Sequence, residues 1–171
     1  LSMEMNMDNA IAARNAMNEV SPVKISFNDL IIKACASALR LHPDVNSSWM
    51  SARAGSNEAD FIRQNHHIHI GSALALPEGL IVPVIKFADQ KTLSQIAAEA
   101  KMLYAKAKDK KIQPSDFTGN TFTISNLGML DIEEFTAIIN PPDSCILAVG
   151  NIRETVIRKN GNFDVTNVMK V

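Results

Sequence analysis

Cysteine is scarce in this sequence, with two residues among 171. Cys35 and Cys145 both lie in apolar stretches, and their spacing matches neither a disulfide framework nor a zinc site. A reducing compartment is therefore expected. Cys145 is interpreted as a core residue. For Cys145 the alternative is an acyl-carrying thiol, which would need a histidine or cationic neighbour that apolar surroundings do not supply.

An excess of charge of either sign is also missing, since 17 basic and 18 acidic residues leave a formal net charge of -1. Such a balance excludes the electrostatic footprint of a nucleic-acid or anionic-membrane partner. Hydrophobic runs long enough to span a bilayer are absent, and no apolar signal segment follows residue 1. A soluble protein without nucleic-acid or membrane partners is expected.

Hydrophobic residues nevertheless make up 46% of the chain, which is enough for one real core. No internal repeat, low-complexity tract or linker divides the sequence, so residues 1–171 are interpreted as a single domain. The chain starts in mid-pattern at Leu1 and ends on an apolar segment at Val171. We therefore expect both ends to be cuts from a longer polypeptide.

Three helices follow from periodicity and capping signals. A strand-like alternation over residues 1–8 is followed by a predicted helix over 9–20 that Asp8 is expected to cap. Ser26 and Asp29 have the spacing of a capping box ahead of a helix over 27–42. The third helix, within residues 91–111, has apolar side chains at three- and four-residue steps, namely Leu93, Ile96, Ala97, Ala100, Leu103 and Ala107.

Strands are predicted elsewhere. Residues 44–87 mix short apolar runs with Gly and Pro turns, so strands and loops are expected there and no long helix. Further strands are predicted over 120–125, 144–152 and 155–165, the last containing a hairpin turn at Asn160-Gly161. Interleaved helices and strands with a hairpin favour an α/β fold with a mixed sheet and packed helices.

Ser125 ends a β-branched run and is followed at once by Asn126, Leu127 and Gly128. It has no Gly-x-Ser-x-Gly elbow, so it is not a hydrolase nucleophile by motif. Two interpretations remain open from the pattern. Its hydroxyl could donate a hydrogen bond to a developing oxyanion, or it could satisfy a nearby backbone group.

Other polar features carry weaker signals. His66, His67 and His69 could indicate a metal site, but no carboxylate or cysteine completes the set, so surface or interface histidines on a strand are favoured. The turn at Glu78-Gly79 and the later Pro83 indicate a segment that edges the sheet or lines a cleft. Asn140 precedes two prolines in a stiff turn, which could equally be a connecting loop.

Several separated motifs together resemble one family. The stretches "VNSSW", "PEGLIVPV", "GNTFTISNLG" and "INPP" occur in an order and spacing similar to the catalytic domain of dihydrolipoamide acyltransferases of 2-oxoacid dehydrogenase complexes. The resemblance covers nearly the whole chain. "TISNLGML" looks most like the acetyl-transferring branch of the pyruvate dehydrogenase complex.

The resemblance implies a fold like that of chloramphenicol acetyltransferase and acyl transfer from a dihydrolipoyl carrier to coenzyme A. Coenzyme A would be a substrate, the lipoyl group would belong to a separate domain, and no metal would be needed. Implied partners are a homotrimer within a larger core, lipoyl domains, and the decarboxylase and dihydrolipoamide dehydrogenase components. Ser125 would stabilise the oxyanion, with Asn126, Gly128, Gly79, Pro83 and Asn140 beside the substrate channel. The compartment would be the bacterial cytoplasm or the mitochondrial matrix.

One departure concerns the general base. The family uses a histidine in a His-x-x-x-Asp-Gly motif, and none of the four histidines here has Asp-Gly at that spacing. The motif is expected shortly after Val171, so the chain as given is expected to be inactive. Phe87 replaces a common acid and Asp131 replaces a common glycine, which leaves two local geometries open.

Two rival functions remain. A non-catalytic trimeric scaffold that organises partner enzymes would lack the base in the parent protein. A free-standing acetyltransferase for a small hydroxylated molecule would have no lipoyl domain ahead of Leu1.

Overall fold

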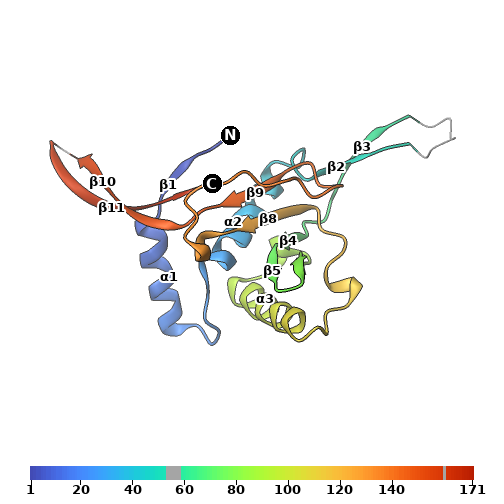
Figure 1. Ribbon diagram of the computed structural model, residues 1–171, viewed down its shortest axis with the longest axis horizontal. Coiled ribbons are helices and arrows are strands. Elements are labelled where there is room, and N and C mark those ends of the chain that lie inside the picture. Colours follow the sequence, from blue (N-terminus) through green and yellow to red (C-terminus); the bar gives the residue numbers. More distant parts are fainter. Residues whose placement is uncertain (53–58, 160) are drawn as a thin grey trace.

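Two helices pack on one face of a mixed sheet, and two hairpins project from this body in opposite directions in the computed structural model (Figure 1). The structure describes residues 1–52, 59–159 and 161–171. The helices are α1 (Asp8–Val20), α2 (Phe27–Leu41) and α3 (Leu93–Lys108), with short 3-10 helices η1 (Ala88–Gln90), η2 (Pro114–Asp116) and η3 (Gly128–Leu130).

The strands form four sheets among the described residues. The central sheet has the order β7-β4-β8-β9, and its β4-β8 and β8-β9 pairs are parallel whereas β4-β7 is antiparallel. Its strands are β4 (Ile70–Ser72), β7 (Val84–Ile85), β8 (Phe122–Asn126) and β9 (Ile146–Val149). The predicted mixed sheet with packed helices is confirmed.

Antiparallel strands make up the remaining sheets. β2 (Ser47–Met50) and β3 (Phe61–Gln64) form one projecting hairpin, and β5 (Leu74–Leu76) pairs with β6 (Gly79–Ile81). The other projecting hairpin joins β10 (Ile152–Lys159) to β11 (Asn162–Lys170), whose far edge pairs with β1 (Glu4–Asn6). This confirms the predicted hairpin, although Asn160 of its turn lies outside the described residues.

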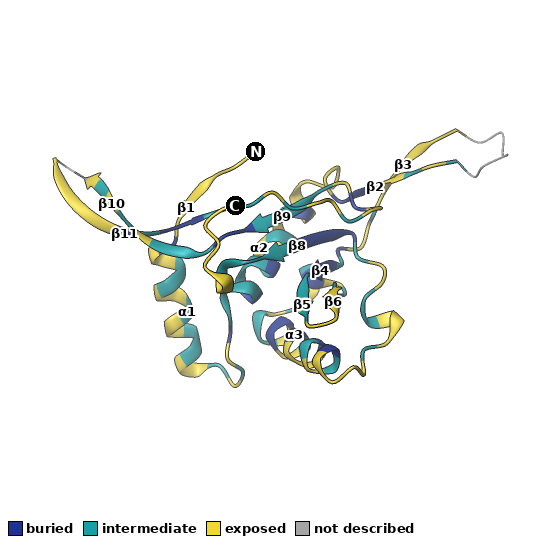
Figure 2. Ribbon diagram, viewed as in Figure 1, coloured by how far each residue is buried: buried dark blue, intermediate teal, exposed yellow. Residues whose placement is uncertain are grey.

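The core lies between the central sheet and the helices, where Figure 2 shows the buried residues gathered. Ile32 of α2, Ile96 of α3 and Ile124 of β8 are all fully buried there. The helix capping boxes at Ser26 and Thr92 are both formed. The predicted apolar stripe of α3 is confirmed at five of its six positions: Leu93 is half-buried, and the buried residues are Ile96, Ala97, Ala100, Leu103 and Ala107.

The N-terminal strand differs from the prediction. It spans three residues rather than eight, and Met3 and Met5 are exposed while Met7 is buried. β1 pairs with β11 alone at the edge of a narrow three-stranded sheet. The alternation of methionines therefore marks a strand, but of its apolar side chains only Met7 reaches the core, while Met3 and Met5 are exposed.

Asp8 does not cap α1, which corrects a second prediction. Met7 is the N-cap residue, and the Asp8 carboxylate accepts hydrogen bonds from the Thr166 hydroxyl at 2.5 Å and the Asn167 backbone N–H at 2.9 Å. The side chain thus joins α1 to β11. These hydrogen bonds hold the pKa of Asp8 well below its usual range.

This contact predicts a pH-dependent loss of stability on replacing Asp8 by asparagine. A depressed folded-state pKa stabilises the fold above the unfolded pKa, about 4 for aspartate, and this stabilisation is lost as the pH falls further. Asp8→Asn is expected to lower the melting temperature at pH 7, with the gap to wild type closing below about pH 4. Thermal unfolding across pH measures it. Glu19→Gln at the other end of α1 is the control, and a gap independent of pH would contradict the prediction.

Candidate active site

Strand β8 presents two chemically different faces because its side chains alternate. Phe122 and Ile124 are buried in the core on the helix side. On the other face the Thr123 hydroxyl donates to the Asp143 carboxylate, which precedes β9. Ser125 follows Thr123 on this second face. The strand therefore carries a row of hydroxyls on the face turned away from the helices.

Ser125 is half-buried and pairs with Ala148 of the parallel strand β9. The strand continues one residue further than predicted, to Asn126. Among the described residues, the Ser125 hydroxyl has no hydrogen-bond partner, so the alternative in which it satisfies a backbone group is not found. The hydroxyl is thus available to donate to a ligand atom.

The turn after Ser125 is held by both neighbouring residues named in the sequence prediction. The Asn126 side-chain oxygen accepts from the backbone N–H of Gly128 at 2.9 Å. Gly128 lies so close to the next strand connection that a Cβ there would be 2.7 Å from the carbonyl oxygen of Gly150. Position 128 therefore tolerates no side chain without a shift of backbone.

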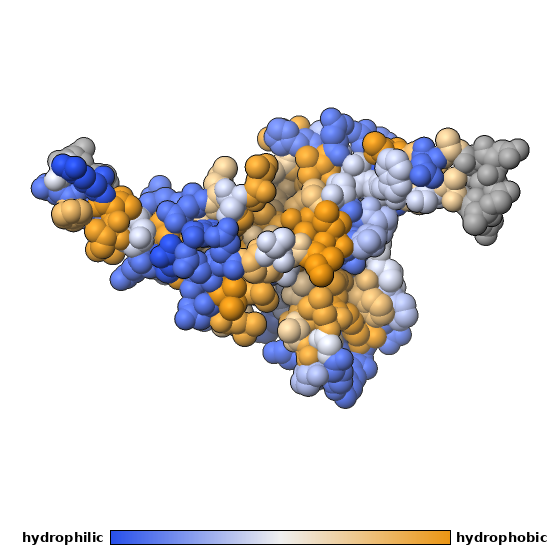
Figure 3. All heavy atoms as spheres, turned by 45° about the horizontal axis from the view of Figure 1, so that its top comes forward, coloured by the Kyte–Doolittle hydropathy of each residue, from blue (hydrophilic) through white to orange (hydrophobic). Residues whose placement is uncertain are grey.

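A pocket of about 420 Å³ adjoins β9. It is lined by, among others, Leu1, Phe135, Ile139, Cys145, Ala148 and Val171. Ala148 of this lining is the residue paired with Ser125, so the pocket borders the strand next to the one that carries the hydroxyl, and no residue of β8 is among its lining residues. Figure 3 shows hydrophobic side chains gathered near the centre of one face of the molecule. The lining is mainly apolar but includes the charged residues Glu134 and Lys170, so it suits a ligand with both apolar and polar groups.

The weaker predicted channel residues are dispersed. Asn140 is half-buried and its amide lies 3.5 Å from the Thr123 hydroxyl, which brings it to the face of Ser125. Pro83 is buried, and its carbonyl accepts from the backbone N–H of Ser72 at 2.9 Å. Gly79 is exposed at the start of β6, where it pairs with Leu76. Among the described residues that line the pocket, none of these three is found.

The turn predicted at Glu78-Gly79 lies one residue earlier. Pro77 and Glu78 form it, and Gly79 already belongs to β6 with a φ of 141°. Glycine is the residue that adopts such a backbone without strain. Its role is therefore the geometry of the β5-β6 hairpin.

Asp143 was missed by the sequence analysis, which treated its segment as a connecting loop. It is 5% exposed, and one carboxylate oxygen accepts from the Thr123 hydroxyl at 2.6 Å and from the Asn120 amide at 2.7 Å. Burial raises the pKa of Asp143, opposed by these two hydrogen bonds. A carboxylate placed directly after two prolines was the available signal, because the prolines restrict where it can lie.

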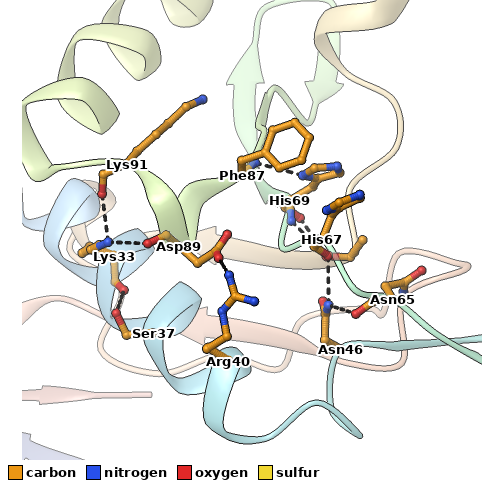
Figure 4. A network of polar contacts seen from close by, with 11 residues as sticks. Lys33, Ser37, Arg40, Asn46, Asn65, His67, His69, Phe87, Asp89 and Lys91 are labelled. Atoms are coloured by element: carbon orange, nitrogen blue, oxygen red, sulfur yellow. Dashed lines mark hydrogen bonds and ion pairs between the residues drawn. The ribbon is translucent and has the colours of Figure 1, made fainter.

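The three clustered histidines do not lie on a strand, which corrects the prediction. They precede β4, and the rings of His67 and His69 stack with centroids 5.9 Å apart (Figure 4). Burial lowers the pKa of His69, whose Nδ1 accepts from the backbone N–H of Phe87 at 3.0 Å. In the described part of the chain, no group of three or more His, Cys, Asp or Glu side chains is arranged to hold a metal ion.

The structure shows the local backbone geometry at Phe87 and Asp131, the two positions that the sequence left open. Both have left-handed backbones, with φ of 52° and 59°. Aspartate and glycine tolerate that conformation better than phenylalanine. Phe87 compensates by packing its ring edge-on against His67 and His69. The Asp131 carboxylate accepts from the Asn151 amide at 2.6 Å.

The two thiols have different surroundings. Burial raises the pKa of Cys35 to about 11, so its thiol stays protonated at neutral pH and is a poor nucleophile. Cys145 is half-buried, packs against the core and also lines the pocket. Cys145 therefore lies at the margin of the core and not inside it, which corrects the prediction of a core cysteine.

Among solved structures, this architecture is that of acyltransferase catalytic cores. A dihydrolipoamide acetyltransferase from Azotobacter vinelandii, investigated for the roles of a serine, a histidine and an asparagine in its catalytic mechanism, superposes with a TM-score of 0.88 and 35% identity over 99% of this chain and 69% of that one. A probable dihydrolipoamide acetyltransferase from Listeria monocytogenes superposes with a TM-score of 0.87 and 29% identity, over 99% of this chain and 71% of that one.

No helix in the described residues is long and apolar enough to cross a membrane.

The chain belongs to the 2-oxoacid dehydrogenases acyltransferase (catalytic domain) family, whose sequence model matches residues 1–171. It is similar to the dihydrolipoyllysine-residue acetyltransferase components of mitochondrial pyruvate dehydrogenase complexes from Dictyostelium discoideum, 44% identical over 94% of this chain, and Schizosaccharomyces pombe, 42% over 99%. The chain spans 24% and 35% of the length of these relatives.

Proposed function

We propose that this chain is the catalytic domain of a dihydrolipoyllysine acetyltransferase, which moves an acetyl group from a dihydrolipoyl carrier to coenzyme A. The observation that carries the proposal is the Ser125 hydroxyl, which lies near the end of β8, pairs with the pocket-lining residue Ala148 and has no hydrogen-bond partner among the described residues. The names of the curated relatives and the family match support the choice of reaction.

In the proposed reaction the thiol sulfur of coenzyme A attacks the carbonyl carbon of the acetyl thioester. A free thiol has a pKa of about 8.5, so a base must take its proton. The new carbon–sulfur bond places negative charge on the carbonyl oxygen, which accepts a hydrogen bond from Ser125. The bond to the lipoyl sulfur then breaks, and that sulfur receives the proton.

Ser125 supplies the hydrogen-bond donor to the oxyanion. The sequence motif that would identify the general base is not found at any histidine of these 171 residues. No His-x-x-x-Asp-Gly sequence occurs around the four of them. His67 and His69 instead pack edge-on against the ring of Phe87. The Asn46 amide donates to the backbone carbonyl of His67 in the same cluster (Figure 4). We therefore assign the proton transfer to a histidine outside this stretch of sequence.

Coenzyme A and the lipoyl group, carried on a separate domain, act as substrates, so the proposed chemistry needs no metal. A homotrimer within a larger core is the proposed assembly. The match to the cubic core of a pyruvate dehydrogenase multienzyme complex supports it, with a TM-score of 0.88 and 35% identity. Both projecting hairpins expose large apolar side chains, which subunit contacts would cover. These are Trp49 and Ile62 on the β2-β3 hairpin and Phe163 and Val165 on the β10-β11 hairpin.

Lipoyl domains and the decarboxylase and dihydrolipoamide dehydrogenase components are the proposed further partners. Relatives with mitochondrial names and relatives from Rickettsia species support either the mitochondrial matrix or the bacterial cytoplasm as the compartment.

The test is a transfer assay with the complete polypeptide, acetyl-dihydrolipoamide and coenzyme A. Acetyl-coenzyme A is the expected product, and residues 1–171 alone are expected to form none, because the base is missing. A complete protein that assembles but does not transfer would support the scaffold function instead. Acetylation of a hydroxylated small molecule without lipoyl transfer would support a free-standing acetyltransferase.

A further inference from the structure

Three polar side chains from three different elements meet where the helices pack on the central sheet. The Tyr104 hydroxyl of α3 donates to the Ser72 hydroxyl of β4 at 2.8 Å. The Asn28 amide nitrogen, in the first turn of α2, lies 3.1 Å from both hydroxyl oxygens. We call Asn28, Ser72 and Tyr104 the helix–sheet triad.

The triad lies against an apolar core, where polar groups are expensive to bury. Ser72 is 3% exposed, and the Tyr104 ring packs against the core cluster. Burial raises the pKa of Tyr104, opposed by its hydrogen bond with Ser72. Replacing a hydrogen-bonded polar group by apolar side chains of the same shape can be nearly neutral for stability. Stability alone therefore does not require these polar groups, and their hydrogen bonds indicate a second role.

Among the described residues, the side chain of Asn126 is hydrogen-bonded to the triad. Its amide nitrogen donates to the Asn28 side-chain oxygen at 3.3 Å, while its own side-chain oxygen accepts from the Gly128 backbone N–H. Asn126 immediately follows Ser125. Its side chain therefore links the triad to the turn that ends β8, on the face of the strand opposite to the serine.

We propose that Asn28, Ser72 and Tyr104 are positioning residues, which hold Asn126 and thereby fix the direction of the Ser125 hydroxyl. This inference rests on the proposed function. An oxyanion donor is effective when its place is set before the charge develops, and small displacements weaken it. The β8-β9 pairing holds the backbone of Ser125, and the triad holds the residue after it.

Tyr104→Phe is the main test, because it removes the hydroxyl and keeps the ring in the core. In the complete polypeptide it is expected to lower kcat for acetyl transfer about three- to tenfold while each KM stays within about twofold. Ser72→Ala is expected to act in the same direction and provides a second route if Tyr104→Phe folds poorly. Ser37→Ala, the same change on the exposed side of α2, is the control expected to leave kcat unchanged.

A double-mutant cycle separates positioning from a structural role. If the triad acts through the Ser125 hydroxyl, Tyr104→Phe has no further effect on kcat in a Ser125→Ala background. A loss of the same size in both backgrounds, or no loss with Ser125 intact, would overturn the inference. If Ser125→Ala alone leaves kcat unchanged, the proposed role of the serine fails instead, which is a distinct result.

Hydrogen exchange gives a readout that does not depend on activity. The Gly128 amide is held by Asn126, so the peptide over residues 122–130 is expected to exchange faster in Tyr104→Phe than in wild type. Equal exchange rates in the two proteins would show that the triad does not hold the turn, and would also overturn the inference.

Discussion

Replacing Ser125 by alanine in the complete polypeptide is expected to lower kcat for acetyl transfer about a hundredfold or more. Removing one preorganised donor to an oxyanion costs roughly 3 to 4 kcal/mol of transition-state stabilisation. The hydroxyl has no hydrogen-bond partner among the described residues, so its loss leaves no buried group unsatisfied. The melting temperature is therefore expected to change little.

Steady-state kinetics with acetyl-dihydrolipoamide and coenzyme A, together with thermal unfolding, measure both effects. Ser144→Ala is the matched control. The Ser144 hydroxyl donates to the Val45 carbonyl at 2.7 Å in an exposed loop and takes no part in the proposed chemistry. A turnover number for Ser125→Ala equal to that of wild type would remove Ser125 from the mechanism. A large drop in melting temperature would assign it a structural role instead.

The largest expected loss of stability follows Gly150→Ala. A Cβ at position 150 would lie 1.9 Å from the carbonyl oxygen of Glu133 and 3.2 Å from that of Ile132. Both contacts are with backbone, so a side-chain rotation cannot relieve them. The same region is tied by the Gly150 N–H to the Lys170 carbonyl at 2.9 Å, so a shift breaks that bond as well. We expect a loss of about 3 kcal/mol or more in the free energy of unfolding.

Denaturant unfolding measures this, and Gly119→Ala is the control. Gly119 has a φ of 85° and open space where a Cβ would be, so alanine there meets backbone strain without a clash. Its cost is expected to be about 1 to 2 kcal/mol. A Gly150→Ala protein no less stable than Gly119→Ala would show that the loop at Glu133 moves aside freely.

The structure differs from the sequence prediction at Asp8 and at the strand before it. Local rules indicated a helix cap, yet the carboxylate bonds instead to Thr166 and Asn167 of β11, far away in sequence. Capping propensity is a weak preference, and several hydrogen bonds from another strand outweigh it. The alternation of residues 1–8 likewise predicted a half-buried strand, whose apolar side chains Met3 and Met5 are exposed.

Short-range sequence signals determined much of the fold. The buried stripe of α3, the capping box of α2 and the hairpin of β10 and β11 each depend on residues within a few positions of one another. The same holds for Ser125, because a hydroxyl near a strand end can be identified from its immediate neighbours. Helix and strand periods are set by backbone geometry, so local sequence is enough.

Tertiary structure decided which distant residues meet. Asn28, Ser72, Tyr104 and Asn126 come together because β4 pairs in parallel with β8 while α2 and α3 pack on the same face. Asp143 reaches Thr123 because β9 lies beside β8. Each polar side chain alone has no periodic signature, and its partner is chosen by the packing of whole elements. The Ser125 hydroxyl could therefore be predicted from the sequence, whereas its contacts to the triad through Asn126 could not.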